Sequence, residues 1–281
     1  MEGKLYLCAT PIGNLEDITF RVVRILKEVD LIAAEDTRHS IKLLNHFNIT
    51  TPMTSYHEFN KYDKAKYLVE QMKTGRSVAC ITDAGTPGIS DPGEELVRQC
   101  MEEGIEVTSL PGPVACITAL TMSGLPTRRF CFEAFLPSDK KERQLILDEL
   151  KTETRTTILY EAPHRLLKTL KELNEVLGNR RITVCRELTK KHETVLASTL
   201  EDAILFYESE PPKGECVIVM EGKSVEALKE EKRQNWMELS LEEHMDYYLN
   251  RGMDKKAAMK AVAKDRNMQK REVYQALIEK C

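Results

Sequence analysis

Short apolar runs alternate with amphipathic stretches along most of this chain, and this alternation limits the folds it can adopt. Four runs have the length and composition of buried strands: Leu5–Ala9, Leu31–Ala34, Ser77–Ile81 and Ile105–Ser109. Helical patterns separate or follow them: Phe20–Lys27, Ile41–Phe47, Lys64–Lys73 and Glu94–Glu103. Strands and helices in this order predict a mostly parallel sheet with helices on its faces.

A second α/β unit is predicted after a change in composition. Leu110–Pro113 reads as a turn, Val114–Ser123 as a helix, and Gly124–Thr127 as the domain boundary. The strands expected beyond it are Phe130–Ala134, Thr156–Tyr160, Ile182–Arg186, Thr194–Ala197 and Glu215–Glu221. The helices expected there are Lys140–Leu150, Arg165–Val176 and Leu200–Phe206. The sequence therefore predicts two α/β domains, at residues 1–123 and 124–224.

The remaining residues follow a different pattern. Val225–Asn235 is charged and polar, so residues 225–239 are predicted to be a solvated linker. From Leu241 the apolar spacing is purely helical, and a tight turn is expected at Asp265–Met268. Three short helices in a helix-turn-helix-like arrangement are predicted over residues 240–281.

Charge is distributed unevenly between these parts. The formal net charge is −4, yet residues 251–281 hold nine Lys or Arg and four Asp or Glu, an excess of +5 that leaves −9 for residues 1–250. A basic segment of this kind suits contact with nucleic-acid phosphates. The candidate side chains are Arg251, Lys255, Lys256, Lys260, Lys264, Arg266, Lys270 and Arg271. The alternative is a solvated helical appendage that serves dimerisation or stability.

Several classes of protein are disfavoured by composition. No window approaches the roughly 20 apolar residues of a membrane span, and the start of the chain lacks the layout of a signal peptide. The eight cysteines include no C-x-x-C pair, and Cys80, Cys185 and Cys216 lie in apolar runs as core residues would. We therefore expect reduced thiols, no metal site, no membrane association and a cytoplasmic location.

Three loops rich in glycine and proline are expected at one edge of the first sheet. They are Thr10–Thr19, Asp83–Gly93 and Pro111–Ala115. Ligands of parallel α/β sheets bind beyond the carboxyl ends of the strands, and small residues there allow close approach to the backbone. Each loop alone could be no more than a tight turn. Neither a phosphate-binding G-x-x-x-x-G-K-[ST] loop nor G-x-G-x-x-G is present, and Asp83 and Asp91 favour a cationic ligand.

Five motifs give these loops a closer interpretation: TPIGNLEDIT from Thr10, AEDTR from Ala34, DAGTPGISDPG from Asp83, PGPVA from Pro111 and YEAPHRL from Tyr160. In this order they resemble the ribosomal RNA small subunit methyltransferase I family, a branch of the tetrapyrrole methylase fold. The resemblance covers essentially the whole chain. It implies S-adenosylmethionine as cofactor, a cofactor cleft between two α/β domains, and a homodimer. The implied reaction is 2′-O-methylation of a cytidine ribose in 16S rRNA at the decoding centre, with 16S rRNA or the small ribosomal subunit as partner.

The resemblance also suggests site residues. Those expected at the cofactor are Pro11, Asp83, Ala84, Gly85, Thr86, Pro87, Ile89, Val114, Ala115, Tyr160, Glu161, Ala162 and Gly214. Gly85-Thr86-Pro87 stands where tetrapyrrole enzymes typically have Gly-Asp-Pro, which favours the RNA branch.

Catalytic candidates follow the strand Leu31–Ala34. Glu35, Asp36 and Arg38 are expected at the same sheet edge as the loops, where they could orient or deprotonate a ribose hydroxyl. Alternatively, the two acids cap the helix that follows. Arg165 could bind RNA phosphate or hold its own loop through a salt bridge.

Two other functions fit part of this pattern. A tetrapyrrole methyltransferase of the cobalamin or siroheme pathways would share the fold and the cofactor but would not need a basic tail. A non-catalytic RNA-binding ribosome-assembly factor would not need an intact loop at Asp83–Pro92.

Overall fold

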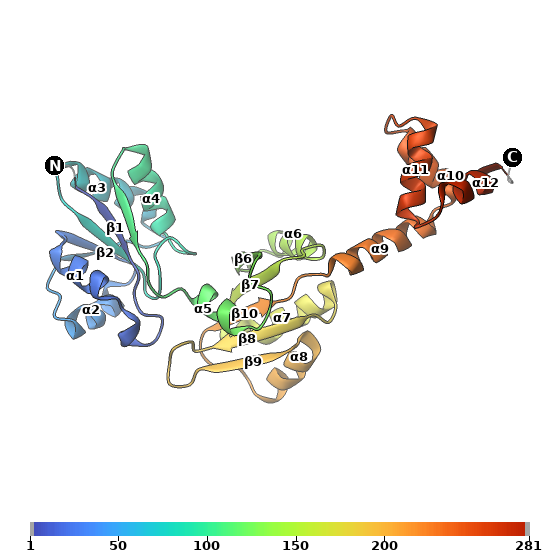
Figure 1. Ribbon diagram of the computed structural model, residues 1–281. Coiled ribbons are helices and arrows are strands. Elements are labelled where there is room, and N and C mark those ends of the chain that lie inside the picture. The colour runs from blue at the N-terminus through green and yellow to red at the C-terminus, as the bar shows by residue number, and fades with distance from the viewer. Residues whose placement is uncertain (1–2, 279–281) are drawn as a thin grey trace. The chain divides into compact units, whose positions relative to one another are not determined.

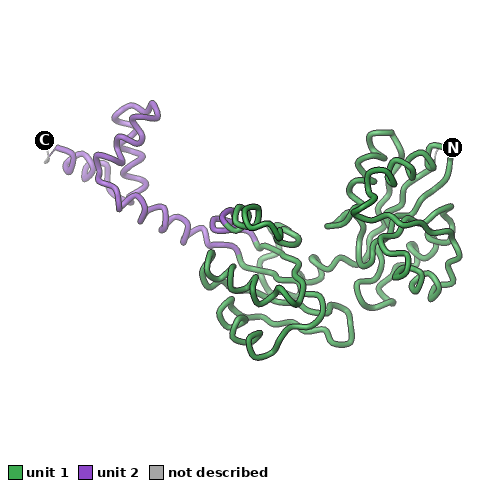
Figure 2. Tube along the Cα trace, turned by 180° about the vertical axis from the view of Figure 1, so that it is seen from behind, with its two compact units in different colours: residues 1–147, 156–221 green, residues 148–155, 222–281 purple. Residues whose placement is uncertain are grey.

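The computed structural model describes residues 3–278. The chain divides into two compact units (Figure 2). One unit comprises the residues up to 147 together with 156–221, and the other comprises 148–155 together with the residues from 222 onward. In the described part of the chain, no helix has the length and apolar character needed to cross a membrane.

The first sheet of the larger unit is wholly parallel, with strand order β3-β2-β4-β1-β5. Figure 1 shows helices α1 to α4 around this sheet. Its strands are β1 (Leu5–Cys8), β2 (Leu31–Ala34), β3 (Met53–Ser55), β4 (Val78–Ile81) and β5 (Val107–Leu110). Its helices are α1 (Phe20–Glu28), α2 (Thr37–His46), α3 (Lys61–Lys73) and α4 (Gly93–Glu102). The predicted parallel sheet is confirmed. Only β3 was not anticipated, because its three residues include no apolar run.

Alternate residues of the strands face opposite cores. Leu31 and Ala33 pack on the side of α3 and α4, together with residues such as Leu68 and Leu96. Ile32 and Ala34 pack on the side of α1 and α2. Strands buried on both faces carry unbroken apolar runs, which explains why they are visible in the sequence. The expected burial of Cys80, Cys185 and Cys216 is also confirmed.

The second sheet has strand order β6-β7-β10-β8-β9 and is mixed. Its strands are β6 (Phe130–Phe135), β7 (Thr156–Glu161), β8 (Arg181–Arg186), β9 (Thr194–Thr199) and β10 (Cys216–Met220). The neighbouring helices are α5 (Ala115–Met122), α6 (Lys140–Leu150), α7 (Pro163–Leu177) and α8 (Leu200–Ser209). β6 and β7 are parallel, whereas β10 is antiparallel to β7 and β8. Residues of α5 share a core with β7 and β10, which joins the two halves of this unit.

The smaller unit contains the helices α9 (Val225–Glu238), α10 (Leu241–Leu249), α11 (Lys255–Asp265) and α12 (Lys270–Ile278). The turn after Asp265 is where the sequence predicted it. The segment 225–235, predicted to be a linker, is instead most of helix α9, which Ser224 caps. No residue of α9 is buried, so its charged composition reflects a solvated helix rather than an irregular segment.

Arg266 lies in the core of the smaller unit and is not available to phosphate, contrary to expectation. Its guanidinium donates to the carbonyl oxygens of Trp236, Leu239 and Ser240, at 2.6, 2.5 and 3.0 Å. It also donates to Nδ1 of His244 at 3.1 Å. Because carbonyls at a helix end lack partners within the helix, Arg266 satisfies the end of α9 and joins it to the bundle.

Candidate active site

A cavity of about 400 Å³ lies at the carboxyl ends of the strands of the first sheet. The loops after β1, β2, β4 and β5 form one wall, and residues from β7 and β10 form the other. All of these belong to the larger unit. The volume is in the range of roughly 300–1,000 Å³ that small-molecule sites occupy. The predicted cleft between two α/β halves is therefore present.

The loop after β4 is held against the loop after β1. The backbone groups of Thr10 and Gly85 exchange hydrogen bonds of 2.9 and 3.1 Å, which forms an isolated antiparallel bridge. Gly85 has φ = +88°, a conformation that side chains disfavour. A Cβ atom there would also lie 3.3 Å from Ile12 and 3.4 Å from the carbonyl oxygen of Pro113. The backbone conformation therefore favours glycine at this position, and an added Cβ would fit only tightly against Ile12.

Asp91 organises the second half of the same loop. Its carboxylate accepts hydrogen bonds from the backbone N–H groups of Gly88, Ile89 and Gly93, at 2.8, 3.0 and 2.7 Å respectively. Hydrogen bonds to an ionised acceptor are among the stronger ones in proteins. Asp91 therefore fixes the backbone that faces the cavity and the start of α4.

The end of β2 places Glu35 in the cavity wall and Asp36 beside it. Burial raises the pKa of Glu35, because the charged form loses hydration. Asp36 instead caps α2, accepting from the backbone N–H of Arg38 at 2.8 Å, and it forms an ion pair with the Arg38 guanidinium. These hydrogen bonds lower the pKa of Asp36 to about 2. Of the three catalytic candidates, only Glu35 lines the cavity; Arg38 is exposed.

Tyr160 connects the two halves of the site. Its hydroxyl oxygen accepts a hydrogen bond from the backbone N–H of Cys116 at 3.1 Å, in the first turn of α5. Val114, the N-cap residue of α5, has no side chain that could accept such a bond. The phenol of β7 thus stabilises the start of the helix that carries Ala115 into the cavity.

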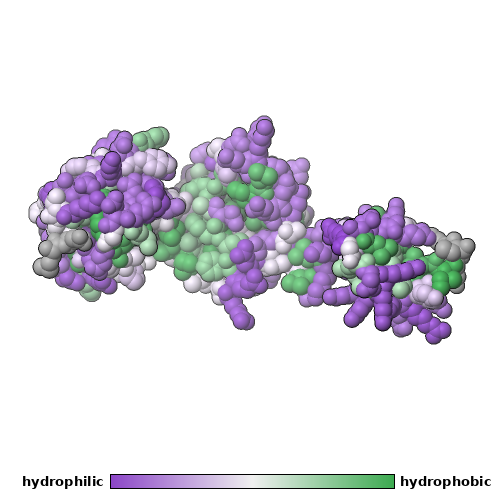
Figure 3. Space-filling view, turned by 90° about the horizontal axis from the view of Figure 1, so that it is seen from above, coloured by the Kyte–Doolittle hydropathy of each residue, from purple (hydrophilic) through white to green (hydrophobic). Residues whose placement is uncertain are grey.

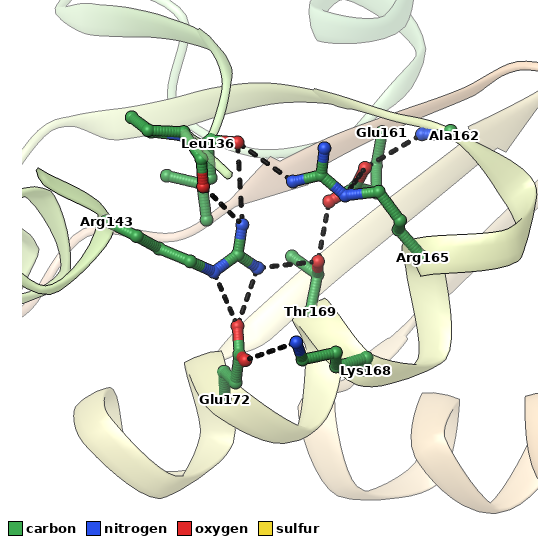
Figure 4. Close-up of polar contacts among 9 residues, drawn as sticks. Leu136, Arg143, Glu161, Ala162, Arg165, Lys168, Thr169 and Glu172 are labelled. Carbon is green, nitrogen blue, oxygen red and sulfur yellow. Dashed lines mark hydrogen bonds and ion pairs between the residues drawn. The ribbon is translucent and has the colours of Figure 1, made fainter. Parts of the chain in front are cut away.

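Behind the cavity, Glu161 is the centre of a buried polar network (Figure 4). Its carboxylate accepts from Thr169 Oγ1 at 2.5 Å and lies 3.3 Å from Nε of Arg165. Arg165 also donates to the carbonyl oxygen of Leu136 at 2.9 Å, and Arg143 donates to Thr169 at 2.9 Å. Arg165 therefore makes the structural salt bridge that was the alternative to RNA contact.

Ten of the thirteen residues expected at the cofactor line this cavity: Asp83, Ala84, Gly85, Thr86, Ile89, Val114, Ala115, Tyr160, Glu161 and Ala162. Pro11 lines a neighbouring cavity, and Pro87 and Gly214 line neither. The Cα of Gly214 faces Glu187, whose side-chain oxygen would lie 2.2 Å from an added Cβ.

Ile12, Ser90 and Pro163 also line the cavity, and they belong to loops or motifs that the sequence indicated without being named as site residues. The lining residues that the sequence did not indicate are Thr82, Phe135, Leu188, Glu215, Cys216 and Val217. Cys216 and Val217 begin the central strand β10 and resemble core residues in the sequence. Their place at the start of a predicted strand, next to the expected cofactor residue Gly214, is the one feature of the sequence that could have indicated them.

The charged residues of the cavity wall are all acidic. They are Glu35, Asp83, Asp91, Glu161 and Glu215, and no Lys, Arg or His of the described chain lines it. A wall of this kind favours a cationic ligand over an anionic one. This extends the prediction made from Asp83 and Asp91 alone.

The predicted RNA-binding side chains of the smaller unit are solvent-exposed. Lys255, Lys256, Lys260 and Lys264 lie on α11 and Arg271 lies on α12. None of them forms an ion pair with another residue in the range 3–278. Cations without protein partners are free to meet phosphate.

Comparison with known proteins agrees with this architecture. The profile of the family described as Tetrapyrrole (Corrin/Porphyrin) Methylases matches residues 4–204. A protein of Halalkalibacterium halodurans named ribosomal RNA small subunit methyltransferase I is 49% identical over 97% of this chain and 94% of its own length. A protein of the same name from Thermotoga maritima is 46% identical, over 79% of this chain and 99% of its own length.

Among solved structures, uroporphyrin-III C-methyltransferase from Thermus thermophilus, complexed with S-adenyl homocysteine, has the same fold. Its TM-score is 0.53 at 19% identity, over 77% of this chain and 92% of that one. The fold, the strand-end cavity and near-full-length relatives thus agree, and the chain belongs to the tetrapyrrole methylase family and, within it, to the ribosomal RNA small subunit methyltransferase I family.

Proposed function

We propose that this chain transfers a methyl group from S-adenosylmethionine to the 2′-hydroxyl of a cytidine ribose in 16S rRNA, at the decoding centre. The observation that carries the proposal is the cavity at the strand ends, whose charged residues are all carboxylates. The exposed Lys and Arg side chains of α11 and α12, in the basic segment 251–281 of the same chain, support RNA as the substrate. The names of its relatives specify the small ribosomal subunit.

The cavity wall fits the chemistry of the cofactor. S-adenosylmethionine supplies a methyl group on a positively charged sulfur, next to an adenosine and a charged amino-acid part. The carboxylate of Asp83 suits the positive groups, and the apolar side chains of Ile12, Val114 and Leu188 suit the adenosine.

Glu35 is the proposed proton acceptor. In methyl transfer an oxygen–carbon bond forms, a carbon–sulfur bond breaks, and the hydroxyl proton must leave the ribose. A carboxylate with a raised pKa, held in the cavity wall, is suited to receive that proton. Asp36 and Arg38 are proposed to support it by fixing the start of α2 beside Glu35.

The activity is tested with small ribosomal subunits and 16S rRNA from a strain that lacks the corresponding methyltransferase. The purified protein should bind S-adenosylmethionine in calorimetry and transfer labelled methyl groups. Primer extension at low nucleotide concentration should then stop at one decoding-centre cytidine. Modification of a base, of another region, or of a tetrapyrrole but not of RNA would refute the assignment.

We propose that α11 and α12 bind rRNA through Lys255, Lys256, Lys260, Lys264 and Arg271. Each lost phosphate contact should weaken binding and reduce its salt dependence. Reversing Lys255, Lys256 and Lys260 to Glu should sharply reduce methylation of ribosomal substrate without changing cofactor affinity. The matched control reverses three exposed lysines outside α11 and α12, Lys66, Lys229 and Lys232, and equal effects of both sets would argue against a specific RNA surface.

We also propose that the protein is a homodimer and that it lies in the cytoplasm. Figure 3 shows apolar colour over one face of the α/β part of the chain. Phe130 of β6 and Val195 of β9, the two edge strands of the second sheet, are large apolar residues that remain exposed, as interface residues would be in a single copy. Sedimentation equilibrium should give twice the mass of one chain, and Val195→Glu should shift it toward the monomer.

A further inference from the structure

A second cavity adjoins the first in the larger unit and has a different charge. It has a volume of about 480 Å³ and shares Ile12, Thr82, Asp83, Ala84 and Glu215 with the cavity already described. Its other walls are the loop after β1, which includes Pro11 and Leu15, and one face of α2. A ligand here would therefore be separated from the first cavity only by residues that both share.

Helix α2 contributes two side chains to this second cavity that can donate hydrogen bonds to a phosphate. His39 and Lys42 are three residues apart, so they lie on the same face of the helix. Both are exposed, and neither side chain has a hydrogen bond or ion pair with a residue of the described chain. The cations nearby differ, because Arg38 is paired with Asp36, and Lys190 is paired with Glu187 and Glu215.

The contrast between the two cavities matches the charges of the two reactants. The first cavity has only carboxylates among its charged residues, whereas the second adds the ammonium groups of Lys42 and Lys190 to the shared Asp83 and Glu215. A methyl donor with a cationic sulfur suits the first, and a nucleotide with its anionic phosphate suits the second. His39 also lies in the first turn of α2, where the helix dipole favours an anion.

We propose that the second cavity holds the RNA nucleotide that accepts the methyl group, with Lys42 and His39 binding its phosphate. The apolar surfaces of Pro11, Leu15 and Leu43 then contact its ribose and base. The ribose then lies where the two cavities meet, at the shared residues Thr82–Ala84. Its hydroxyl can there reach both the methyl donor and the Glu35 carboxylate, which accepts from the Asp83 N–H. This inference rests on the proposed function and adds to it the residues that position the substrate.

The test compares Lys42→Glu with Lys66→Glu. Lys66 is an exposed lysine of α3 that lines neither cavity and makes no side-chain hydrogen bond or ion pair within residues 3–278, so it controls for the change in charge. With small ribosomal subunits as substrate, Lys42→Glu should raise KM by about tenfold or more, because one charge-assisted contact is replaced by repulsion. The Kd for S-adenosylmethionine from calorimetry should stay within about twofold of the wild-type value. Lys42→Arg should restore most of the affinity for the subunit.

Salt dependence gives a second readout. Loss of one phosphate contact at Lys42 should reduce the slope of log KM against log salt by about 1, whereas Lys66→Glu should leave it unchanged. If Lys42→Glu matches Lys66→Glu in KM and slope while the wild type methylates the subunit, the inference is wrong and the proposed function stands. A wild-type protein that binds S-adenosylmethionine but methylates no ribosomal substrate would overturn both.

Discussion

The backbone N–H of Asp83 donates a hydrogen bond to Oε2 of Glu35 over 3.3 Å, and this contact ties the loop after β4 to the end of β2. The Asp83 carboxylate in turn accepts from the backbone N–H of Asp36 at 3.1 Å. Two neighbouring strand ends thus hold the Glu35 carboxylate in a fixed place in the cavity wall. Fixed geometry of this kind is what a proton acceptor requires.

Replacement of Glu35 by Gln should lower the methylation rate by about 10²-fold or more, the usual effect of losing a general base. The Kd for S-adenosylmethionine should change little, since Gln can still accept the hydrogen bond from Asp83. Single-turnover rates and calorimetry separate the two effects. Glu94→Gln, at an exposed acid in the first turn of α4, is the control. If Glu35→Gln and Glu94→Gln methylate at equal rates, Glu35 is not the proton acceptor and catalysis depends on positioning of the reactants alone.

The raised pKa of Glu35 also predicts how stability depends on pH. A carboxyl group whose pKa is raised on folding contributes stability below its unfolded pKa and loses it as pH rises through the folded value. Near neutral pH the wild type therefore carries the cost of a partly buried charge. Glu35→Gln should have a Tm equal to or above that of the wild type at about pH 7, and the two should converge as pH falls toward about 4, near the unfolded pKa of a glutamate. A lower Tm of the variant at neutral pH would contradict the desolvation argument.

Asp91→Ala should loosen the loop after β4, because three backbone N–H groups lose their shared acceptor. The cost in unfolding free energy should be about 1–3 kcal/mol, the range for hydrogen bonds to a charged group. Cofactor affinity should fall by about tenfold or more, since the loop must then be ordered on binding. Denaturant unfolding and calorimetry measure these effects. Asp63→Ala, at an exposed acid in the first turn of α3, should change affinity little.

Tyr160→Phe removes the acceptor of the Cys116 N–H without removing the ring. We expect a loss of about 1 kcal/mol in unfolding free energy, typical of one hydrogen bond. Affinity for S-adenosylmethionine should fall by a few-fold, because the start of α5 forms part of the cavity wall. The control is Tyr67→Phe at an exposed tyrosine of α3. If the two variants are equally stable, the phenol does not hold α5.

The helical unit should lose stability in mild acid through His244. Its ring is fully buried and stacks on Trp236 at 3.9 Å. Burial, with the Arg266 charge adding to it, lowers the pKa of His244. A histidine whose pKa is lowered on folding contributes stability above its unfolded pKa of about 6.5, and this stability is lost as pH falls through the folded value.

Tryptophan fluorescence measures this effect, because Trp236 is the one tryptophan of the sequence. The helical unit should unfold more easily at about pH 5 than at about pH 7.5, on either side of the ordinary histidine pKa. His192→Gln, at an exposed histidine, should keep this pH dependence. A pH-independent transition in the wild type would contradict the prediction.

The parts of the fold that leave a local signal can be predicted from the sequence. β2 and β4 were predicted because strands covered on both faces must be apolar throughout. β3 and α9 left weaker signals, since β3 is short and half-buried, and a helix with no buried face looks like a linker. The loop after β4 was found for the same reason as β4 itself, because it follows a strand that the sequence makes obvious.

The remaining site residues depend on tertiary structure. Cys216 and Val217 reach the cavity only because β10 lies between β7 and β8, which no local pattern specifies. An aspartate at position 36 could act either as a base or as a helix cap. The hydrogen bond that its carboxylate accepts from the backbone N–H of Arg38 shows that it caps α2. Likewise, Lys255 and Arg266 look alike in sequence, yet one is exposed and the other buried.

The bridge between Thr10 and Gly85 has a consequence for how quickly a ligand can be captured. The two reciprocal backbone hydrogen bonds hold the loops after β1 and β4 together at the cavity wall before a ligand binds. Association should therefore follow a single exponential phase whose rate rises linearly with ligand concentration, with no slower step for loop closure. Differences in affinity among cofactor analogues should then appear as differences in residence time.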